Sequence, residues 1–133
     1  MFLQFFQQLF CFFLHVGETG SFRKPLRREE EQACFEALAA GDRSAREQLI
    51  LHNMRLVAHV IKKYGMPQPE QEELISIGTV GLVKAVDSFD CTKGARFATY
   101  ASKCINNEIL MNFRSQKKHA DQIYMGEPIE TDG

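Results

Sequence analysis

The sequence predicts an all-α protein: a small helical bundle preceded by a short apolar N-terminal helix. Two observations support this prediction. Between residues 73 and 89, apolar side chains recur every three or four positions in two adjacent rows, as in a helix with wide apolar coverage. Between residues 97 and 114, a similar spacing gives two distinct faces. A chain of 133 residues is long enough for one helical core and too short for two domains.

Residues 1–16 are strongly apolar, with a narrow polar stripe formed by Gln4, Gln7, Gln8, Cys11 and His15. The segment is shorter than the ~20 residues that span a bilayer and lacks the basic start of a secretory signal. We expect an interfacial helix, and a helix docked on its own domain is the alternative. Residues 18–25 form a linker. The basic residues between 23 and 28 either bind an anionic membrane surface or form a solvated run.

Two helices are expected in the next stretch. The first runs from Glu29 to Ala40 and is closed by Gly41, and Asp42 is a good cap for the second. The second should extend to residue 64 as one continuous helix. One face of it is lined by Leu49, Asn53, Leu56, Val57, Val60, Ile61 and Tyr64. The prolines at positions 67 and 69 then end it, because proline cannot continue a helix.

The third predicted helix ends near Ser88 and contains two interior glycines, Gly78 and Gly81. Each costs about 1 kcal/mol relative to alanine, so we expect another backbone to come very close on that side. The remaining surface, which begins at Glu70, Glu72 and Glu73, is available for a partner outside the domain. An ordinary buried helix is the alternative.

Residues 89–94 form a turn, and the last helix should run to about Gln116, followed by a frayed polar tail over residues 119–133. One face of this helix is expected to be its core stripe: Ala98, Ala101, Ile105, Ile109 and Phe113. The other face mixes aromatic, amide and basic side chains, which suit unstacked bases and phosphates: Phe97, Tyr100, Cys104, Asn107, Met111 and Arg114. The alternative is that Phe97 and Tyr100 only fill the core at the helix start.

The formal net charge is only −1, but the charges are segregated along the chain. Between positions 93 and 119 a single acid, Glu108, stands among the bases Lys93, Arg96, Lys103, Arg114, Lys117 and Lys118. Just before this segment, Lys84 stands among the acids Glu70, Glu72, Glu73, Asp87 and Asp90. One segment can therefore meet phosphates, while its neighbour meets a basic or mixed protein surface.

The sequence contains no motif that is typical of a catalytic site or a metal site. The four cysteines are far apart, which indicates reduced thiols of a cytosolic protein, and the histidines lack metal-ligand spacing. The sequence contains no nucleophile elbow and no phosphate-binding glycine loop. We therefore expect no enzyme activity, no cofactor, no metal and no small-molecule substrate.

Three linked motifs resemble bacterial RNA polymerase sigma factors. Residues 73–86, ELISIGTVGLVKAV, resemble their core-binding signature, and residues 96–101, RFATYA, resemble their promoter-melting segment. Upstream, residues 49–58, LILHNMRLVA, resemble the opening helix of the same module, region two. The resemblance runs from about residue 29 to residue 118. Within the family, the run LISIGT and the apolar leader are similar to the sporulation sigma-K group.

This resemblance implies two sets of site residues. The residues expected to bind core RNA polymerase are Glu73, Leu74, Ser76, Ile77, Thr79, Val80 and Leu82. Those expected to bind and melt the promoter minus-ten element are Arg96, Phe97, Thr99, Tyr100, Lys103, Asn107, Leu110, Met111, Arg114, Lys117 and Lys118. Phe97 and Tyr100 match the family's base-stacking positions. Lys103 and Cys104 replace the tandem tryptophans of housekeeping members, so melting should depend more on Tyr100 and on the polymerase.

The same resemblance divides the chain into three parts. Residues 1–26 would be a hydrophobic pro-sequence and basic linker, residues 27–118 region two, and residues 119–133 the truncated start of the next region. Sigma-K-like proteins are made as precursors whose leader an intramembrane protease removes. We therefore expect a cytoplasmic protein whose precursor associates with the membrane and with a processing protease through residues 1–26.

Complete family members continue into a linker and a C-terminal helix-turn-helix, and neither follows here. The chain is therefore expected to be a fragment or the N-terminal half of an interrupted gene, which binds core polymerase and initiates poorly by itself. A second hypothesis is a membrane-tethered helical interaction protein with a degenerate sigma-like fold, which binds polymerase without initiating. Selectivity for the non-template single strand over scrambled sequence distinguishes the two.

Overall fold

Each short connection in the chain is set by a local polar contact or a glycine. The computed structural model describes residues 3–4, 7 and 22–126. The backbone N–H of Arg27 donates to Glu30 at the start of α2 (Arg28–Ala39), and the Asp42 carboxylate accepts from the Ser44 N–H, 2.9 Å away, at the start of α3 (Arg43–His52). The cap predicted at Asp42 is therefore confirmed.

The second predicted helix is in fact two, α3 and α4 (Met54–Lys62), and the prediction of one continuous helix was wrong. The break lies at Asn53, whose φ and ψ are −110° and 8°. Its buried side-chain amide donates to the Leu49 carbonyl over 2.6 Å, and its backbone N–H bonds to Ile50. Asparagine offers the backbone such local partners in place of helical ones, and the chain turns here as a result.

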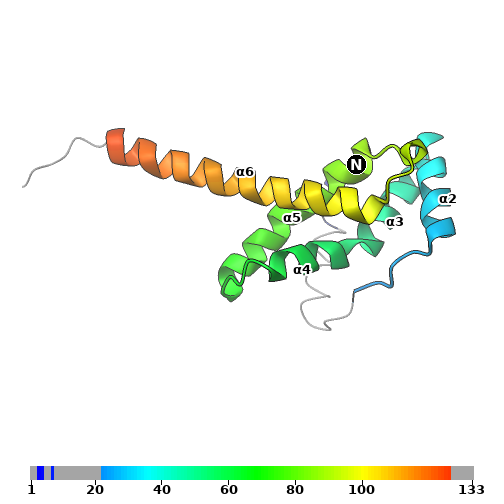
Figure 1. Ribbon diagram of the computed structural model, residues 1–133, viewed down its shortest axis with the longest axis horizontal. Helices are drawn as coiled ribbons and strands as arrows, with labels where there is room; N and C mark the ends of the chain where they lie inside the picture. The colour runs from blue at the N-terminus through cyan, green and yellow to red at the C-terminus, as the bar shows by residue number, and fades with distance from the viewer. Residues whose placement is uncertain (1–2, 5–6, 8–21, 127–133) are drawn as a thin grey trace, which may run out of the picture.

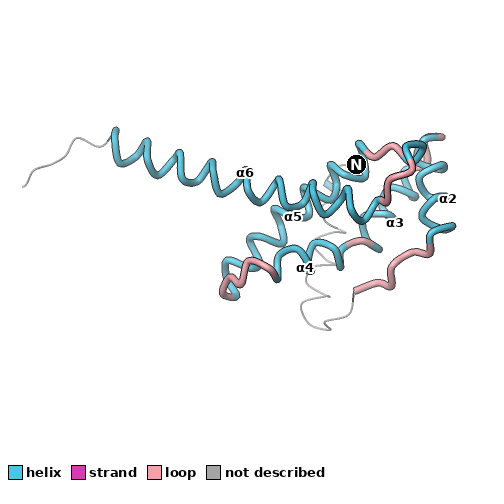
Figure 2. Tube along the Cα trace, viewed as in Figure 1, coloured by secondary structure: helices cyan, strands magenta, loops and turns pink. Residues whose placement is uncertain are grey.

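The two remaining predicted helices correspond to α5 (Gln68–Ser88) and α6 (Phe97–Gly126). The short 3₁₀ helix η1 (Cys91–Lys93) lies between them. Asp90 accepts from the Thr92 N–H at the start of η1, and Gly94 follows with a φ of 72°. Such a left-handed backbone suits glycine because it has no Cβ. The described residues contain no strand (Figure 2), in agreement with the predicted all-α class.

A single apolar core lies where α5 crosses α6, with α3 and α4 packed against them and α2 at one end (Figure 1). Its largest fully buried side chains are Phe97, Leu49, Ile50, Met54, Ile61, Leu82, Ile105, Ile109, Val57 and Val86. The predicted close approach of another backbone is confirmed at Gly81, whereas Gly78 faces side chains only. A Cβ on Gly81 would lie 2.7 Å from the Ile105 Cα, and one on Gly78 would lie 2.9 Å from the Val57 Cγ1.

Helix α6 continues well past the bundle (Figure 1), although the sequence predicted an end near residue 116. Its residues from Arg114 to Ile123 are all exposed. The expected frayed tail was therefore wrong for residues 119–126, and residues 127–133 lie outside the described part. This stretch is rich in good helix formers such as lysine, alanine and glutamine, so it continues the helix without burial.

The segment before α2 lies against the bundle. Phe22 and Leu26 pack on the core, and the Lys24 carbonyl lies 2.8 Å from His52 Nδ1. The predicted apolar helix of residues 1–16 lies mostly outside the described residues. Among the helices that the structure describes, none combines the length and the apolar character needed to cross a bilayer.

Candidate functional site

The outer side of α5 carries only part of the residue set predicted to bind a partner protein. Glu73, Ser76 and Val80 are exposed, with Val80 at 43%, and Ile77 is half-buried. Glu73, Ser76 or Ile77, and Val80 are three or four residues apart, so all four lie on one side of the helix. They therefore form one continuous strip, which we call the α5 strip.

The other three predicted residues of α5 do not reach a partner. Leu74, Thr79 and Leu82 are 3%, 4% and 0% exposed. Leu74 and Leu82 belong to the core, and the Thr79 hydroxyl donates to the Ile75 carbonyl over 2.7 Å. The prediction of direct contact was wrong for these side chains, because the helix needs them to pack on its own domain.

Phe97 was predicted to stack on a base, and the structure contradicts this. It is 1% exposed, and its ring centre lies 5.0 Å from that of Phe35 and 5.2 Å from that of Phe89. The alternative that Phe97 fills the core at the helix start is confirmed. Ala98, which was predicted to face the core, is exposed instead.

Tyr100 occupies the border between this aromatic cluster and the surface. It is half-buried, and its ring centre lies 5.5 Å from that of Phe89 at a tilt of 42°. Its hydroxyl lies 2.7 Å from the Ser88 Oγ at the end of α5. Sequence reasoning identified Tyr100 but missed Ser88, since a serine at a helix end has no distinctive pattern.

The remaining predicted nucleic-acid residues share an accessible row along α6, the α6 stripe. Its exposed members are Thr99, Lys103, Asn107, Met111, Arg114, Lys117 and Lys118, with Leu110 half-buried and Arg96 exposed just before the helix. From Thr99 to Lys117 most of them are three or four residues apart and share one broad side of the helix, while Lys118 lies beside Lys117 and points away from it. The α6 stripe thus combines basic side chains with an amide, a hydroxyl and a thioether.

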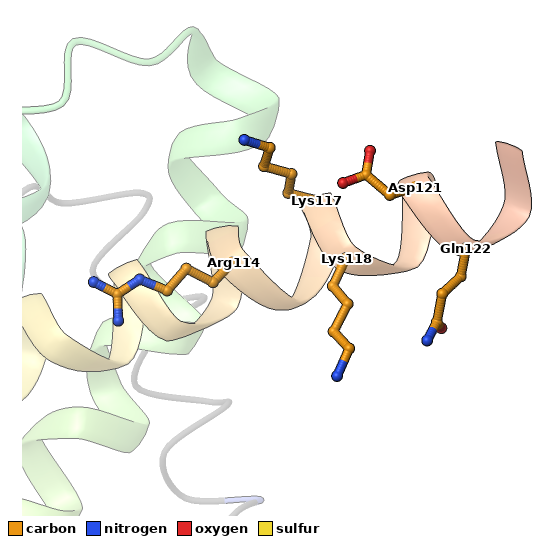
Figure 3. A pocket seen from close by; sticks show the side chains of 5 residues that line it. All are labelled: Arg114, Lys117, Lys118, Asp121 and Gln122. Carbon is orange, nitrogen blue, oxygen red and sulfur yellow. The ribbon is translucent and has the colours of Figure 1, made fainter. Parts of the chain in front are cut away.

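The far half of the α6 stripe is predominantly basic. Arg114, Lys117, Lys118, Asp121 and Gln122 line a depression on the surface of the helix. Figure 3 shows Lys117 and Lys118 projecting from different sides of the helix, and Arg114 extending back toward the bundle. Such a spread of cations suits a strand of phosphates better than a single small anion.

The two charges that interrupt the segregated pattern pair with each other. Lys84 Nζ on α5 lies 3.0 Å from Glu108 Oε2 on α6. Sequence reasoning missed this pair, although each residue was the single exception in its own segment. The pair neutralises both exceptions, so the acidic start of α5 and the basic stripe of α6 remain separate surfaces.

The titratable groups with shifted pKa values lie away from both surfaces. Hydrogen bonds from Ser44 lower the pKa of Asp42, and those from Thr92 lower the pKa of Asp90, so both carboxylates are caps. Burial raises the pKa of the Cys34 thiol, which favours its protonated form. The described residues contain no His, Cys, Asp and Glu cluster that could hold a metal ion.

Together, fold and surface define a small all-helical domain with an acidic-apolar helix on one side and a basic helix on another. A family model described as "Sigma-70 region 2" matches residues 49–119, more than half of the chain. The chain belongs to the sigma-70 family of RNA polymerase sigma factors, through region 2.

Curated relatives agree with this assignment. The chain is 43% identical over 126 residues to an RNA polymerase sigma-28 factor of Bacillus thuringiensis subsp. kurstaki, covering 95% of this chain and 53% of that protein. It is 45% identical over 100 residues to the RNA polymerase sigma-K factor of Bacillus subtilis, covering 75% and 34%. It is 42% identical over 118 residues to an RNA polymerase sigma-E factor of Clostridium acetobutylicum, covering 89% and 50%. The chain thus spans about a third to a half of the length of these relatives.

Proposed function

We propose that this chain binds core RNA polymerase through the α5 strip and captures the melted non-template strand of the promoter minus-ten element through the α6 stripe. The observation that carries the proposal is the separation of these surfaces on two helices that pack directly together. The α5 strip offers apolar and acidic groups, which suit a protein partner. The α6 stripe offers cations and an amide, and the neighbouring Tyr100 offers one half-exposed aromatic ring; together these groups suit an unpaired strand.

The exposure of each side chain determines which residues of α5 and α6 are proposed to make contact. On α5, contact falls to Glu73, Ser76, Ile77 and Val80, while Leu74, Thr79 and Leu82 set the shape of the helix from inside. Of the two aromatic residues predicted on α6, only Tyr100 is left for base stacking, because Phe97 is buried in the core. Extrusion of a base from the stack costs a few kcal/mol, and stacking on an aromatic ring returns roughly 1–3 kcal/mol per base.

Phosphate contacts along the α6 stripe supply affinity without sequence information. Arg96 and Lys103 stand on either side of Tyr100 in the sequence and suit the phosphates of the captured strand. Asn107, Leu110 and Met111 suit the adjoining duplex, with Arg114, Lys117 and Lys118 beyond them. Sequence preference is therefore expected near Tyr100 and Asn107, and salt dependence mainly from the far half of α6.

The proposal extends to the setting of this activity. The similarity to a sigma-K factor supports a sporulation role, and residues 1–26 are proposed to be a pro-sequence that contacts a membrane surface and a processing protease. The chain would act inside the cell, without catalysis and without a cofactor. Cleavage of the full chain by membrane fractions of sporulating cells, followed by mass spectrometry, tests the pro-sequence. An intact N-terminus would contradict it.

Binding to purified core polymerase tests the central proposal. The complex of full chain and core is titrated with a single-stranded minus-ten oligonucleotide and with a scrambled oligonucleotide over a range of salt. We expect selective capture, which Tyr100→Ala abolishes while core binding persists. His59→Ala, a change at an exposed residue of α4, serves as the control.

Two outcomes would contradict the proposal. Core binding without selectivity would favour a polymerase-binding protein that does not open promoters. Absence of core binding would remove the proposed role of the α5 strip. As an independent readout, Tyr100→Ala should lower the permanganate reactivity of promoter thymines when the remaining sigma regions are supplied in trans.

A further inference from the structure

Ser88, the last residue of α5, contacts two oxygen atoms at once. Its Oγ lies 2.7 Å from the Lys84 carbonyl oxygen and 2.7 Å from the Tyr100 hydroxyl. A serine hydroxyl carries one proton, and a carbonyl oxygen can only accept. The Ser88 proton is therefore directed to Lys84, one helical turn earlier.

This leaves one arrangement for the second contact. Because the Ser88 proton is used, the Tyr100 hydroxyl must donate to the Ser88 Oγ. The phenol oxygen of Tyr100 then presents only lone pairs to its surroundings. Tyr100 on α6 is therefore the donor, because the hydroxyl of Ser88 at the end of α5 already donates to Lys84.

Phe89 restrains the same tyrosine from another side. The two ring centres are 5.5 Å apart at a tilt of 42°, within the usual range for paired aromatic rings. Phe89 is in turn packed 4.9 Å from Phe35 and 5.2 Å from Phe97, measured between ring centres. Tyr100 is therefore held at its hydroxyl and against one face, while the side chain stays half-exposed.

We propose that Ser88 is a positioning residue for Tyr100, which orients the ring in advance for stacking on an unpaired base. This inference rests on the proposed function of the α6 stripe. An ordered ring loses less side-chain freedom when a base arrives, so the hydrogen bond favours capture although Ser88 itself touches no base. The contact also makes the end of α5 part of the nucleic-acid site.

The test uses the full chain bound to core polymerase and a minus-ten oligonucleotide with 2-aminopurine at the extruded position. We expect Ser88→Ala to weaken capture about fivefold, because the released ring must then be ordered when the base arrives. Tyr100→Phe removes the same bond from the other side and should weaken capture to a similar extent. Because both changes remove one interaction, the double variant should bind no more weakly than either single variant.

Two controls separate positioning from a general structural effect. Ser88→Thr keeps the hydroxyl and should capture the strand like the wild type. All variants should stay folded, with thermal midpoints within a few degrees of the wild type and with the same core affinity. Equal or tighter capture by Ser88→Ala would overturn the proposal, as would full additivity in the double variant. Tighter capture would instead identify the contact as a restraint that binding must break.

A measurement without DNA tests the Ser88–Tyr100 hydrogen bond directly. In the free chain labelled with ¹³C at the tyrosine ζ carbon, Ser88→Ala should shift the Tyr100 resonance and leave Tyr64 in place. An unchanged Tyr100 resonance would overturn the proposal directly. Failure of the wild type to select the promoter strand would instead overturn the proposed function, so the two failures are distinguishable.

Discussion

Gly81 on α5 faces the backbone of Ile105 on α6 so closely that an added Cβ would lie 2.7 Å from the Ile105 Cα and 2.9 Å from the Cys104 carbonyl oxygen. No side chain fits in that space without moving one helix. The contact therefore fixes how α5 and α6 cross, and with it the relation between the α5 strip and the α6 stripe.

Gly81→Ala should destabilise the domain. We expect the free energy of unfolding to fall by about 1–2 kcal/mol, because overpacking against backbone atoms outweighs the ~1 kcal/mol that alanine contributes in a helix. Urea denaturation measures this difference.

Gly78→Ala is the matched comparison. Its Cβ would meet side-chain atoms of Val57 and Ile105, at 2.9 and 3.3 Å, which can shift by a few tenths of an ångström more easily than backbone atoms can. This variant should stay within about 1 kcal/mol of the wild type. A Gly81→Ala protein as stable as Gly78→Ala would contradict the proposed role of the close backbone contact.

Changes in the Lys84–Glu108 pair should alter DNA affinity in opposite directions. Glu108→Gln removes the acid that lies beside the α6 stripe and should strengthen single-strand binding about twofold. Lys84→Met leaves Glu108 uncompensated and should weaken it about twofold. The double variant has the same net charge as the wild-type pair and should bind like the wild type. Fluorescence anisotropy at low salt measures all four proteins.

Stability is the control for this charge experiment. Lys84 is 60% exposed, so each single change should alter the free energy of unfolding by less than about 1 kcal/mol. If both single variants weakened DNA binding, the pair would act through structure and not through charge.

Lys117→Ala should reduce the salt dependence of duplex binding. Loss of one phosphate contact lowers the slope of log affinity against log salt by about 0.9, and it weakens all sequences alike. Lys62→Ala changes an exposed lysine of α4 and should leave the slope unchanged. A Lys117→Ala effect confined to one promoter sequence would instead indicate base recognition.

Acid stability should depend on the Asp42 cap. Hydrogen bonds from Ser44 lower the pKa of Asp42 in the folded state, below its ordinary value of 3.8. The cap therefore stabilises the fold fully above the unfolded pKa, and this contribution is lost as the pH falls through the folded pKa. Asp42→Asn keeps an acceptor that does not titrate, so unfolding of this variant should depend less on pH between about 5 and 3. Asp121→Asn, on the far half of α6, should keep the wild-type profile.

The order of helices and the glycine contact could be predicted from the sequence, because both follow from periodicity and from the cost of interior glycine. The break at Asn53 could not, since apolar residues continue on both sides of it. The sequence also left open which residue in the first turn of α6 faces the core. Phe97 lies four residues before Ala101 and Ala98 lies three before it, so either could share its face. The structure buries Phe97, which fills the larger volume between α2 and α5.

The residues of the candidate site, like the fold, could be predicted only in part. Residue types identified Tyr100 and the basic α6 stripe, but exposure decides which members can make contact, and exposure depends on packing between helices. Leu74, Thr79 and Leu82 illustrate this, because the motif that contains them serves both the core and the surface. The Ser88 and Glu108 contacts join different helices, so no local pattern could have revealed them.

Helix α6 is one uninterrupted rod of 30 residues, half anchored and half projecting. At 1.5 Å per residue, Lys118 lies about 27 Å along it from Tyr100, with no hinge between them. The helix thus fixes the distance between Tyr100, where a base is proposed to stack, and Lys118, where phosphates are proposed to bind. A nucleic acid that contacts both points must adopt that interval, and one inserted residue would move the far end by about 1.5 Å and turn it by about 100°.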